Sequence, residues 1–234
     1  MHNNTAFRLP FSFEADCLQE ELRIALERDW SAHYNSADYA GSWESISLRS
    51  MSGKEDDARA FAGAQFHDTP LLEKLPYIQS VVRHFECPIE TVRLLRLAAG
   101  SEIKEHRDPE GGYEDGYLRI HIPVQTNEQV TFIVGGENIP MKNGECWYAD
   151  FNLPHSVKNE SGSDRVHLVI DGVRNVWTDD LFRQCGYDFE AGAKKTRPGR
   201  DALQRMIDEL RLQNTPAALQ LAGALEKELA ERTD

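Results

Sequence analysis

The sequence lacks the features that would make it a membrane protein or a nucleic-acid-binding protein. None of its apolar runs approaches the roughly 20 residues that a membrane-spanning helix needs. Lys and Arg number 26 against 39 Asp and Glu, so the formal net charge is -13. This charge gives no basic footprint for a phosphate backbone and would be repelled by anionic lipid surfaces. We therefore expect a soluble protein with neither a nucleic-acid nor a membrane partner.

Cysteine is scarce, and the four cysteines stand far apart, at positions 17, 87, 146 and 185. Without a CxxC pair, neither a zinc knuckle nor a thioredoxin-like redox motif is expected. Residues 1–10 also lack the basic start and the apolar stretch of a signal peptide. Free thiols in a reducing compartment are the simplest interpretation, so we expect a cytoplasmic protein.

The hydrophobic pattern that is present changes along the chain. Residues 13–29 and 71–85 space their apolar side chains as amphipathic helices do. Short extended runs follow at residues 92–97, 118–124, 130–134, 146–149 and 165–170, with an earlier one at 43–48. Turn residues separate these runs. The pattern predicts a mainly β protein with flanking helices, built as an antiparallel sandwich or barrel.

The pattern changes again after Trp177. Residues 182–200 are expected to form a loop, and two helices then close the chain, the second with Thr215 as its N-cap. We expect the apolar face of this helical hairpin to pack on the β domain or on a second copy of the chain, as a homodimer. The predicted division is a domain over residues 1–178, with its β core at about 92–177, and a helical appendage over residues 179–234.

Three residues are candidate metal ligands: His106, Asp108 and His155. Residues two apart on a strand share a face, so His106 and Asp108 point the same way. His155 follows residues 152–154, Asn-Leu-Pro, where a turn can present its ring toward them. Two imidazoles and one carboxylate form the facial triad that holds Fe(II) and leaves positions open for a cosubstrate and O2. The same ligands also suit zinc or manganese, and His-x-Asp is short enough to occur by chance.

Two of the extended runs carry an Arg-x-His pair, Arg119 with His121 and Arg165 with His167. Strand alternation puts the arginine and the histidine of each pair on one face. An arginine inside an apolar strand needs an anionic partner, because an unpaired buried guanidinium is costly. Taken singly, these residues also suit ordinary salt bridges and hydrogen-bonded core rings. Together, beside a candidate metal site, they indicate a pocket for a dicarboxylate.

Two further arginines, Arg93 and Arg96, lie on the run at residues 92–97. They are three positions apart, so they point to opposite faces of the strand. At most one of them can face the cavity.

These residues, with several stretches around them, resemble the aspartyl/asparaginyl beta-hydroxylase family. The stretches are residues 88–100, 105–108, 118–121 and 164–171, with Trp147 and His155, and a weaker likeness at 43–48 and 75–78. The resemblance implies a double-stranded beta-helix, or jelly-roll, core. It also implies a dioxygenase that uses Fe(II), 2-oxoglutarate and O2 to hydroxylate an amino acid or an aspartyl/asparaginyl-type residue, releasing succinate and CO2.

The resemblance also implies roles for single residues. It makes His106 and His155 iron ligands and pairs Arg165 with the distal carboxylate of 2-oxoglutarate. The expected cosubstrate pocket is lined by Arg119, His121, Arg165 and His167. The animal members of this family, which lie in the endoplasmic reticulum, lack the carboxylate ligand, whereas many bacterial relatives keep it. Asp108 is therefore expected to be the third ligand. The epidermal-growth-factor-like substrate of the animal enzymes is not expected here.

Two other functions are compatible with the sequence. One is hydroxylation of a small natural-product amino acid, free or carrier-bound. The other is a jelly roll that binds metal or 2-oxoglutarate without turnover, as a sensor. A full ligand set together with two Arg-x-His pairs favours an enzyme, because a scaffold alone has no need of them. The expected partner is a small-molecule or peptide substrate.

Overall fold

The computed structural model describes residues 4–231 apart from 34, 62, 110 and 197–199. Its strands are β1 (Ala6–Ser12), β2 (Ser31–Ala32), β3 (Tyr39–Ala40), β4 (Trp43–Ser50), β5 (His67–Asp68), β6 (Ile89–Leu97), β7 (Glu102–His106), β8 (Tyr117–Gln125), β9 (Val130–Val134), β10 (Glu137–Asn138), β11 (Glu145–Ala149), β12 (His155–Asn159) and β13 (Arg165–Val173). Its α-helices are α1 (Ala15–Leu26), α2 (Pro76–Val82), α3 (Val176–Gln184), α4 (Phe189–Thr196), α5 (Arg200–Gln213) and α6 (Pro216–Glu231).

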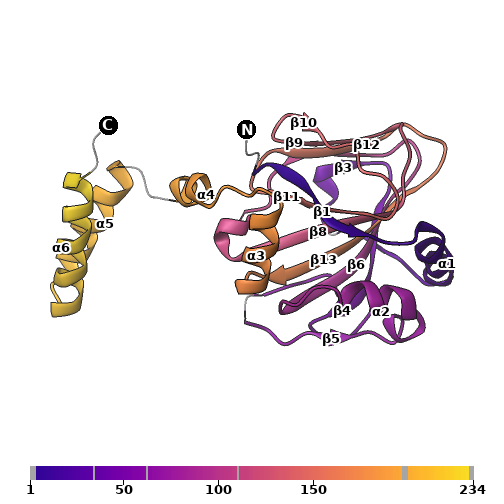
Figure 1. The fold of residues 1–234 in the computed structure, drawn as a ribbon, viewed down its shortest axis with the longest axis horizontal. Helices are drawn as coiled ribbons and strands as arrows, with labels where there is room; N and C mark the ends of the chain where they lie inside the picture. The colour runs from indigo at the N-terminus through magenta and orange to yellow at the C-terminus, as the bar shows by residue number, and fades with distance from the viewer. Residues whose placement is uncertain (1–3, 34, 62, 110, 197–199, 232–234) are drawn as a thin grey trace. The chain divides into compact units, whose positions relative to one another are not determined.

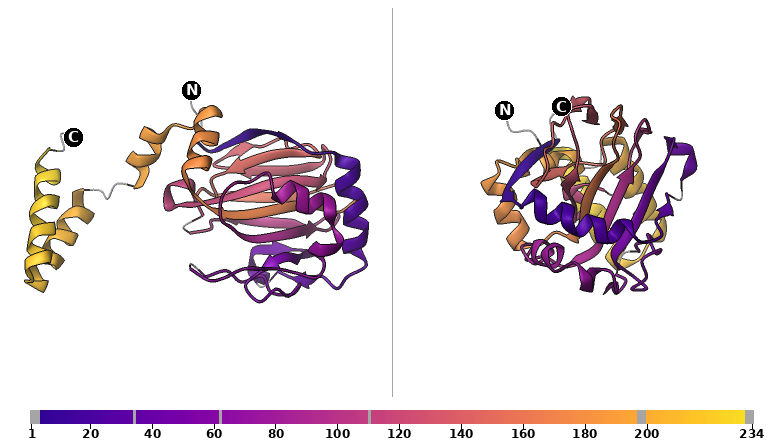
Figure 2. Two further views of the ribbon diagram at one scale, coloured as in Figure 1. Left: turned by 60° about the horizontal axis from the view of Figure 1, so that its bottom comes forward. Right: turned by 90° about the vertical axis from the view of Figure 1, so that its right-hand side faces the viewer.

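Two antiparallel sheets face each other in the described part of the chain (Figure 1). The larger sheet has the order β1-β11-β8-β13-β6-β4-β2, with β5 beside β4, and the smaller has the order β10-β9-β12-β7-β3. Helix α1 lies across one end of the sheets, which is clearest in Figure 2. The predicted jelly-roll, mainly β with flanking helices, is confirmed.

The larger sheet has one face toward helices and one toward the smaller sheet. Alternate residues of β8 and β13, among them Ile120 and Leu168, pack with α1, α2 and α3 in the main hydrophobic core. Leu97, on β6, instead joins Phe132 and Val157 of the smaller sheet in a second cluster. Because the side-chain period of a strand is two, the odd-numbered residues of β8 and β13 must face the space between the sheets. All four residues of the Arg-x-His pairs are odd-numbered.

The helices differ from the sequence prediction at two places. The segment 71–85 is divided, because Pro76 begins α2 at a position where a missing N–H costs nothing, after a short 3-10 turn at Leu72–Lys74. The predicted loop over 182–200 is wrong for most of its described residues, since α3 continues to Gln184 and α4 begins at Phe189, which leaves residues 185–188 as the connection. Residues 197–199 lie outside the described residues. The Phe189 ring packs against Tyr187, 5.0 Å between centroids, which gives this charged segment an apolar anchor.

The chain divides into two compact units, Met1–Phe189 and Glu190–Asp234. The first unit continues past residue 178 because Leu181 and Phe182 of α3 belong to the main core. In the second unit the buried residues of the α5–α6 hairpin include Leu203, Ile207, Ala218 and Ala222. Four other apolar side chains of this unit, Met206, Leu212, Leu219 and Leu221, are exposed. None of the described helices is both long and apolar enough to cross a membrane.

Candidate active site

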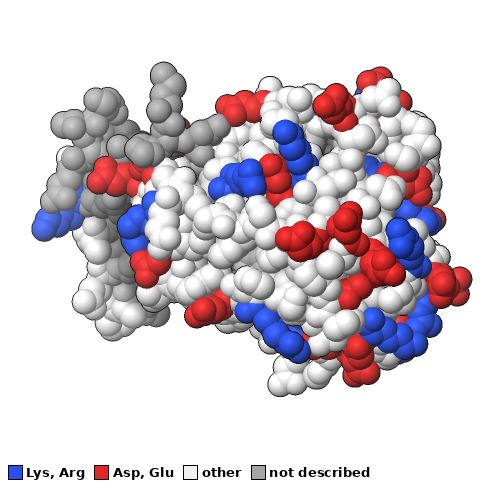
Figure 3. Space-filling model, turned by 45° about the vertical axis from the view of Figure 1, so that its right-hand side comes forward, with Lys and Arg blue, Asp and Glu red and all other residues white. Residues whose placement is uncertain are grey.

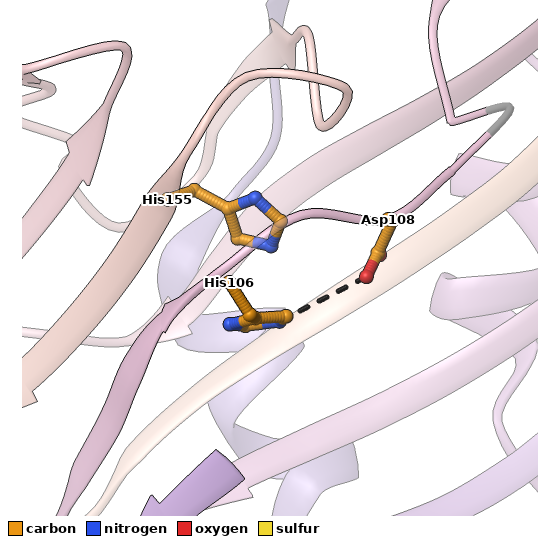
Figure 4. Close-up of side chains that lie close together, drawn as sticks. All are labelled: His106, Asp108 and His155. Carbon is orange, nitrogen blue, oxygen red and sulfur yellow. Dashed lines mark ion pairs between the residues drawn. The ribbon is translucent and has the colours of Figure 1, made fainter.

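The structure brings the three predicted metal ligands together between the sheets. Strands β7 and β12 are neighbours, and their register sets His155 directly opposite His106. Asp108 lies two residues beyond β7, where its backbone N–H donates to the carbonyl of Phe151 at 3.0 Å. One candidate ligand atom from each of the three side chains lies within 4.8 Å of the other two. Figure 4 shows them pointing toward one another.

Both imidazoles are oriented by a backbone carbonyl. Nδ1 of His106 is 2.8 Å from the carbonyl oxygen of Lys104, and Nδ1 of His155 is 3.0 Å from that of Leu153. A carbonyl oxygen only accepts hydrogen bonds, so in each ring Nδ1 carries the hydrogen and Nε2 keeps its lone pair. Burial also lowers the pKa of His155, which favours the neutral ring that a metal requires.

The carboxylate of Asp108 divides its two oxygens between different partners. Oδ1 is 3.8 Å from Nε2 of His106, and Oδ2 accepts a hydrogen bond from Nη1 of Arg119 at 2.5 Å. Burial raises the pKa of Asp108, but the Arg119 guanidinium together with His155 and His106 lowers it more, so the pKa of the carboxyl lies below its usual value. One oxygen of an ionised carboxylate is thus directed to the histidines.

Arg119 is held in turn by Asp171, a residue that was not predicted from the sequence. Arg119 Nε donates to Asp171 Oδ1 at 2.8 Å, and Thr91 Oγ1 donates to Asp171 Oδ2 at 2.7 Å. Arg93 also donates to Asp171 Oδ2. Burial of Asp171 opposes ionisation, but these two guanidiniums hold its pKa well below the usual range. Strand alternation places Asp171 on the same face as Arg165 and His167, and this pattern could have identified it from the sequence.

Arg165 is a buried cation without an acidic partner among the described residues. The residue is 2% exposed, and its Nη2 donates to Nδ1 of His167 at 2.8 Å. Its Nε is buried and makes no hydrogen bond. Burial lowers the pKa of Arg165 to about 9, so the side chain stays charged at neutral pH. A group in this state is stabilised by an anion that enters from outside.

The histidines of the two pairs lie side by side beneath Arg165. Nδ1 of His121 is 3.2 Å from Nδ1 of His167. Because arginine only donates, His167 Nδ1 must accept, so His121 Nδ1 carries a hydrogen and donates to it as well. Burial lowers the pKa of both rings far below the usual value, and both are neutral. His121 Nε2 is left buried and unpartnered.

A cavity of about 700 Å³ contains this arrangement. The predicted residues that line it are His106, Asp108, His155, Arg119, His121 and Arg165. Its remaining wall includes Trp43, Arg93 and Phe132, and the exposed Phe61 lies at its edge. His167 is not among the lining residues and contacts the cavity only through Arg165 and His121. Of the two arginines on β6, Arg93 faces the cavity and Arg96 pairs instead with Glu44, as alternation predicts.

The family model for aspartyl/asparaginyl beta-hydroxylases matches residues 13–175. The chain belongs to this family. Among curated proteins, the L-proline cis-4-hydroxylase of Rhizobium meliloti (strain 1021) is 29% identical over 187 residues. The match covers 77% of this chain and 65% of the hydroxylase, so the chain spans just under two thirds of that relative's length. The family resemblance predicted from the sequence is confirmed.

Solved structures similar to this beta-hydroxylase family member include two prolyl hydroxylases. One is from Trichoplax adhaerens, in complex with a hypoxia inducible factor oxygen degradation domain peptide fragment, with TM-score 0.48, 12% identity and coverage of 73% of this chain and 84% of that one. The other is a Pseudomonas putida prolyl-4-hydroxylase, with TM-score 0.47, 10% identity and coverage of 74% and 94%.

Proposed function

We propose that this protein is an Fe(II)- and 2-oxoglutarate-dependent oxygenase that hydroxylates an unactivated C–H bond of an amino acid. The observation that carries the proposal is the buried, unpaired Arg165 in the same cavity as the His106, Asp108 and His155 cluster. A metal site alone has no use for a buried cation. A dicarboxylate cosubstrate needs both, because one end chelates the metal and the other requires a counter-charge.

The residues present fit a divalent metal. Nε2 of His106, Nε2 of His155 and Oδ1 of Asp108 would hold it, and the orphaned Nε of Arg165 would meet the far carboxylate of 2-oxoglutarate. When bound, iron supplies the redox chemistry by which O2 gives one oxygen atom to succinate and one to the substrate, with release of CO2. The protein orients both histidines, keeps Asp108 ionised and shields the site between two sheets.

The proposed substrate is a small molecule. The name of the Rhizobium meliloti relative states hydroxylation of L-proline, and we propose a free amino acid as the substrate of this protein, a class that includes natural-product amino acids.

The proposed location is the cytoplasm. All four cysteines are free, which supports a reducing compartment. On the face in Figure 3, acidic and basic side chains are interspersed among the described residues.

The test of this function is succinate formation by the purified protein with Fe(II), ascorbate and 2-oxoglutarate. Slow succinate formation is expected without any amino-acid substrate. When an amino-acid library is added, mass spectrometry should show the gain of one oxygen atom in one of its members. Both must vanish when iron is omitted. Binding of 2-oxoglutarate with no succinate under any of these conditions would instead establish a sensor.

A mutation of Arg119 tests the role of this residue, which the sequence predicts to line the cosubstrate pocket. In the structure its charge is paired with Asp108 and Asp171. Outer partners of a ligand typically contribute about 10- to 100-fold in metal affinity. Arg119→Gln should therefore weaken Mn(II) binding, measured by electron paramagnetic resonance, by roughly that factor. Arg96→Gln, on the outer face, is the control. Unchanged metal affinity with weaker 2-oxoglutarate binding would show that Arg119 binds the cosubstrate instead.

The second unit is the subject of another prediction: we propose that it pairs with another copy of the chain through α5 and α6. Its exposed apolar side chains include Leu212, which is 85% exposed, and Leu221, which is 51% exposed. Contact between two copies would remove this apolar surface from water. Deleting residues 200–234 should change the oligomeric state measured by light scattering, and Leu212→Gln with Leu221→Gln should do the same. A truncated chain of unchanged oligomeric state would contradict the pairing.

A further inference from the structure

Arg93 is a second arginine in the cavity with an unused donor. Its side chain is 13% exposed, and its Nη2 donates to Asp171. Its Nε is buried and has no hydrogen-bond partner. Among the described residues, Arg93 and Arg165 are the two arginines in this condition, and both line the cavity. A buried N–H without an acceptor costs free energy unless a ligand supplies one.

The backbone of Arg93 lies well along the sheet from that of Arg165. On β13, Arg165 lies opposite Leu97 of β6, and Val169 lies opposite Arg93. Four residues of strand separate the two positions, which is about 13 Å at the usual rise per residue. The 2-oxoglutarate of the proposed function uses one carboxylate at Arg165 and the other at the metal, so neither is assigned to Arg93.

The ion pairs of the cavity leave Arg93 with a shared counter-charge. Five carboxylates line the cavity, those of Asp38, Glu90, Asp108, Asp115 and Asp171, and among the described residues only Asp171 forms an ion pair with Arg93. Arg119 also pairs with Asp171, so one carboxylate serves two guanidiniums. When Asp108 holds a metal and 2-oxoglutarate meets Arg165, a substrate carboxylate at Arg93 supplies the second counter-charge of this group.

We infer that Arg93 binds the carboxylate of the substrate, so the substrate is a free amino acid or a related small carboxylic acid and not a residue within a peptide. This inference rests on the proposed oxygenase function and narrows its substrate class. A residue inside a peptide has an amide in place of the α-carboxylate, and a neutral amide leaves the positive charge buried. At the edge of the cavity, Glu90 and Asp115 offer carboxylates to the ammonium group of an amino acid.

The test is a binding titration, measured by calorimetry, on the full chain loaded with Mn(II) and 2-oxoglutarate. The probes are the common free L-amino acids, L-proline included, each compared with its carboxamide. We expect at least one acid to bind roughly tenfold or more tightly than its amide. Arg93→Gln should remove this preference, while Arg93→Lys, which keeps the charge but lacks Nε, should retain part of it. Arg96→Gln, on the opposite face of β6, should change neither affinity.

Three results would overturn the inference. They are equal affinity for acid and amide, no binding by any free acid, and a loss of 2-oxoglutarate affinity in Arg93→Gln as large as the loss of amino-acid affinity. In each case normal 2-oxoglutarate binding and uncoupled succinate formation by the wild-type protein would leave the proposed function intact. A wild-type protein that binds no 2-oxoglutarate would overturn the function and the inference together.

Discussion

His155→Ala is expected to abolish 2-oxoglutarate turnover while the protein remains folded. The substitution removes the Nε2 lone pair that, with His106 and Asp108, completes the metal site. His155 stands at the first residue of β12, so the ladder of that strand with β9 is retained through backbone bonds. Succinate formation should fall below detection, as it should in His106→Ala, and Mn(II) binding measured by electron paramagnetic resonance should weaken strongly.

The control for this experiment is His84→Ala, an exposed histidine outside the cavity, which should keep full activity. Thermal unfolding measured by circular dichroism should stay cooperative in all of these variants. Wild-type turnover in either ligand variant would show that the histidine is not a ligand.

Asp108→Gly makes the same test for the carboxylate. It should weaken metal binding and remove most activity, because both the anionic ligand and the partner of Arg119 are lost. Unchanged metal affinity and turnover would mean that two histidines suffice, as in animal members of the family.

Arg165→Gln is expected to raise the concentration of 2-oxoglutarate needed for half-saturation by roughly a hundredfold or more, with metal binding almost unchanged. Removing one partner of a buried charge pair typically costs about 3–5 kcal/mol, which corresponds to such a factor. The pair contributes more here than at a surface, because Arg165 is only 2% exposed. Anaerobic titration of the Fe(II) protein, followed by its metal-to-ligand charge-transfer band, measures the affinity directly.

The stability of Arg165→Gln gives an independent check. Without an anion the guanidinium is a buried, unpaired charge, so its removal should leave the melting temperature of the ligand-free protein unchanged or raise it. The stabilisation that 2-oxoglutarate gives to the metal-loaded protein should be lost at the same time. A variant that saturates at the wild-type concentration, or that melts earlier without ligand, would make Arg165 a structural residue.

The part of the site that follows from alternation along one strand was predictable. Arg119 with His121, and Arg165 with His167, were placed on common faces because the side-chain period of a strand is fixed by backbone geometry. The His-x-Asp pair at the end of β7 was placed in the same way. These predictions needed no knowledge of which strands are neighbours, and the order of several motifs along the chain was enough to indicate the family.

The tertiary structure alone decided which strands meet and in which register. Asp171 lies opposite Arg119, and Val169 lies opposite both His121 and Arg93, because β13 pairs with β8 on one side and with β6 on the other. These pairings join residues up to about 80 positions apart in the chain, and the whole fold selects them by burying one face of each strand. Sequence therefore determined the kinds of charged groups in the cavity. Register determined that Arg119 is already paired, while Arg165 and one donor of Arg93 remain available to ligands.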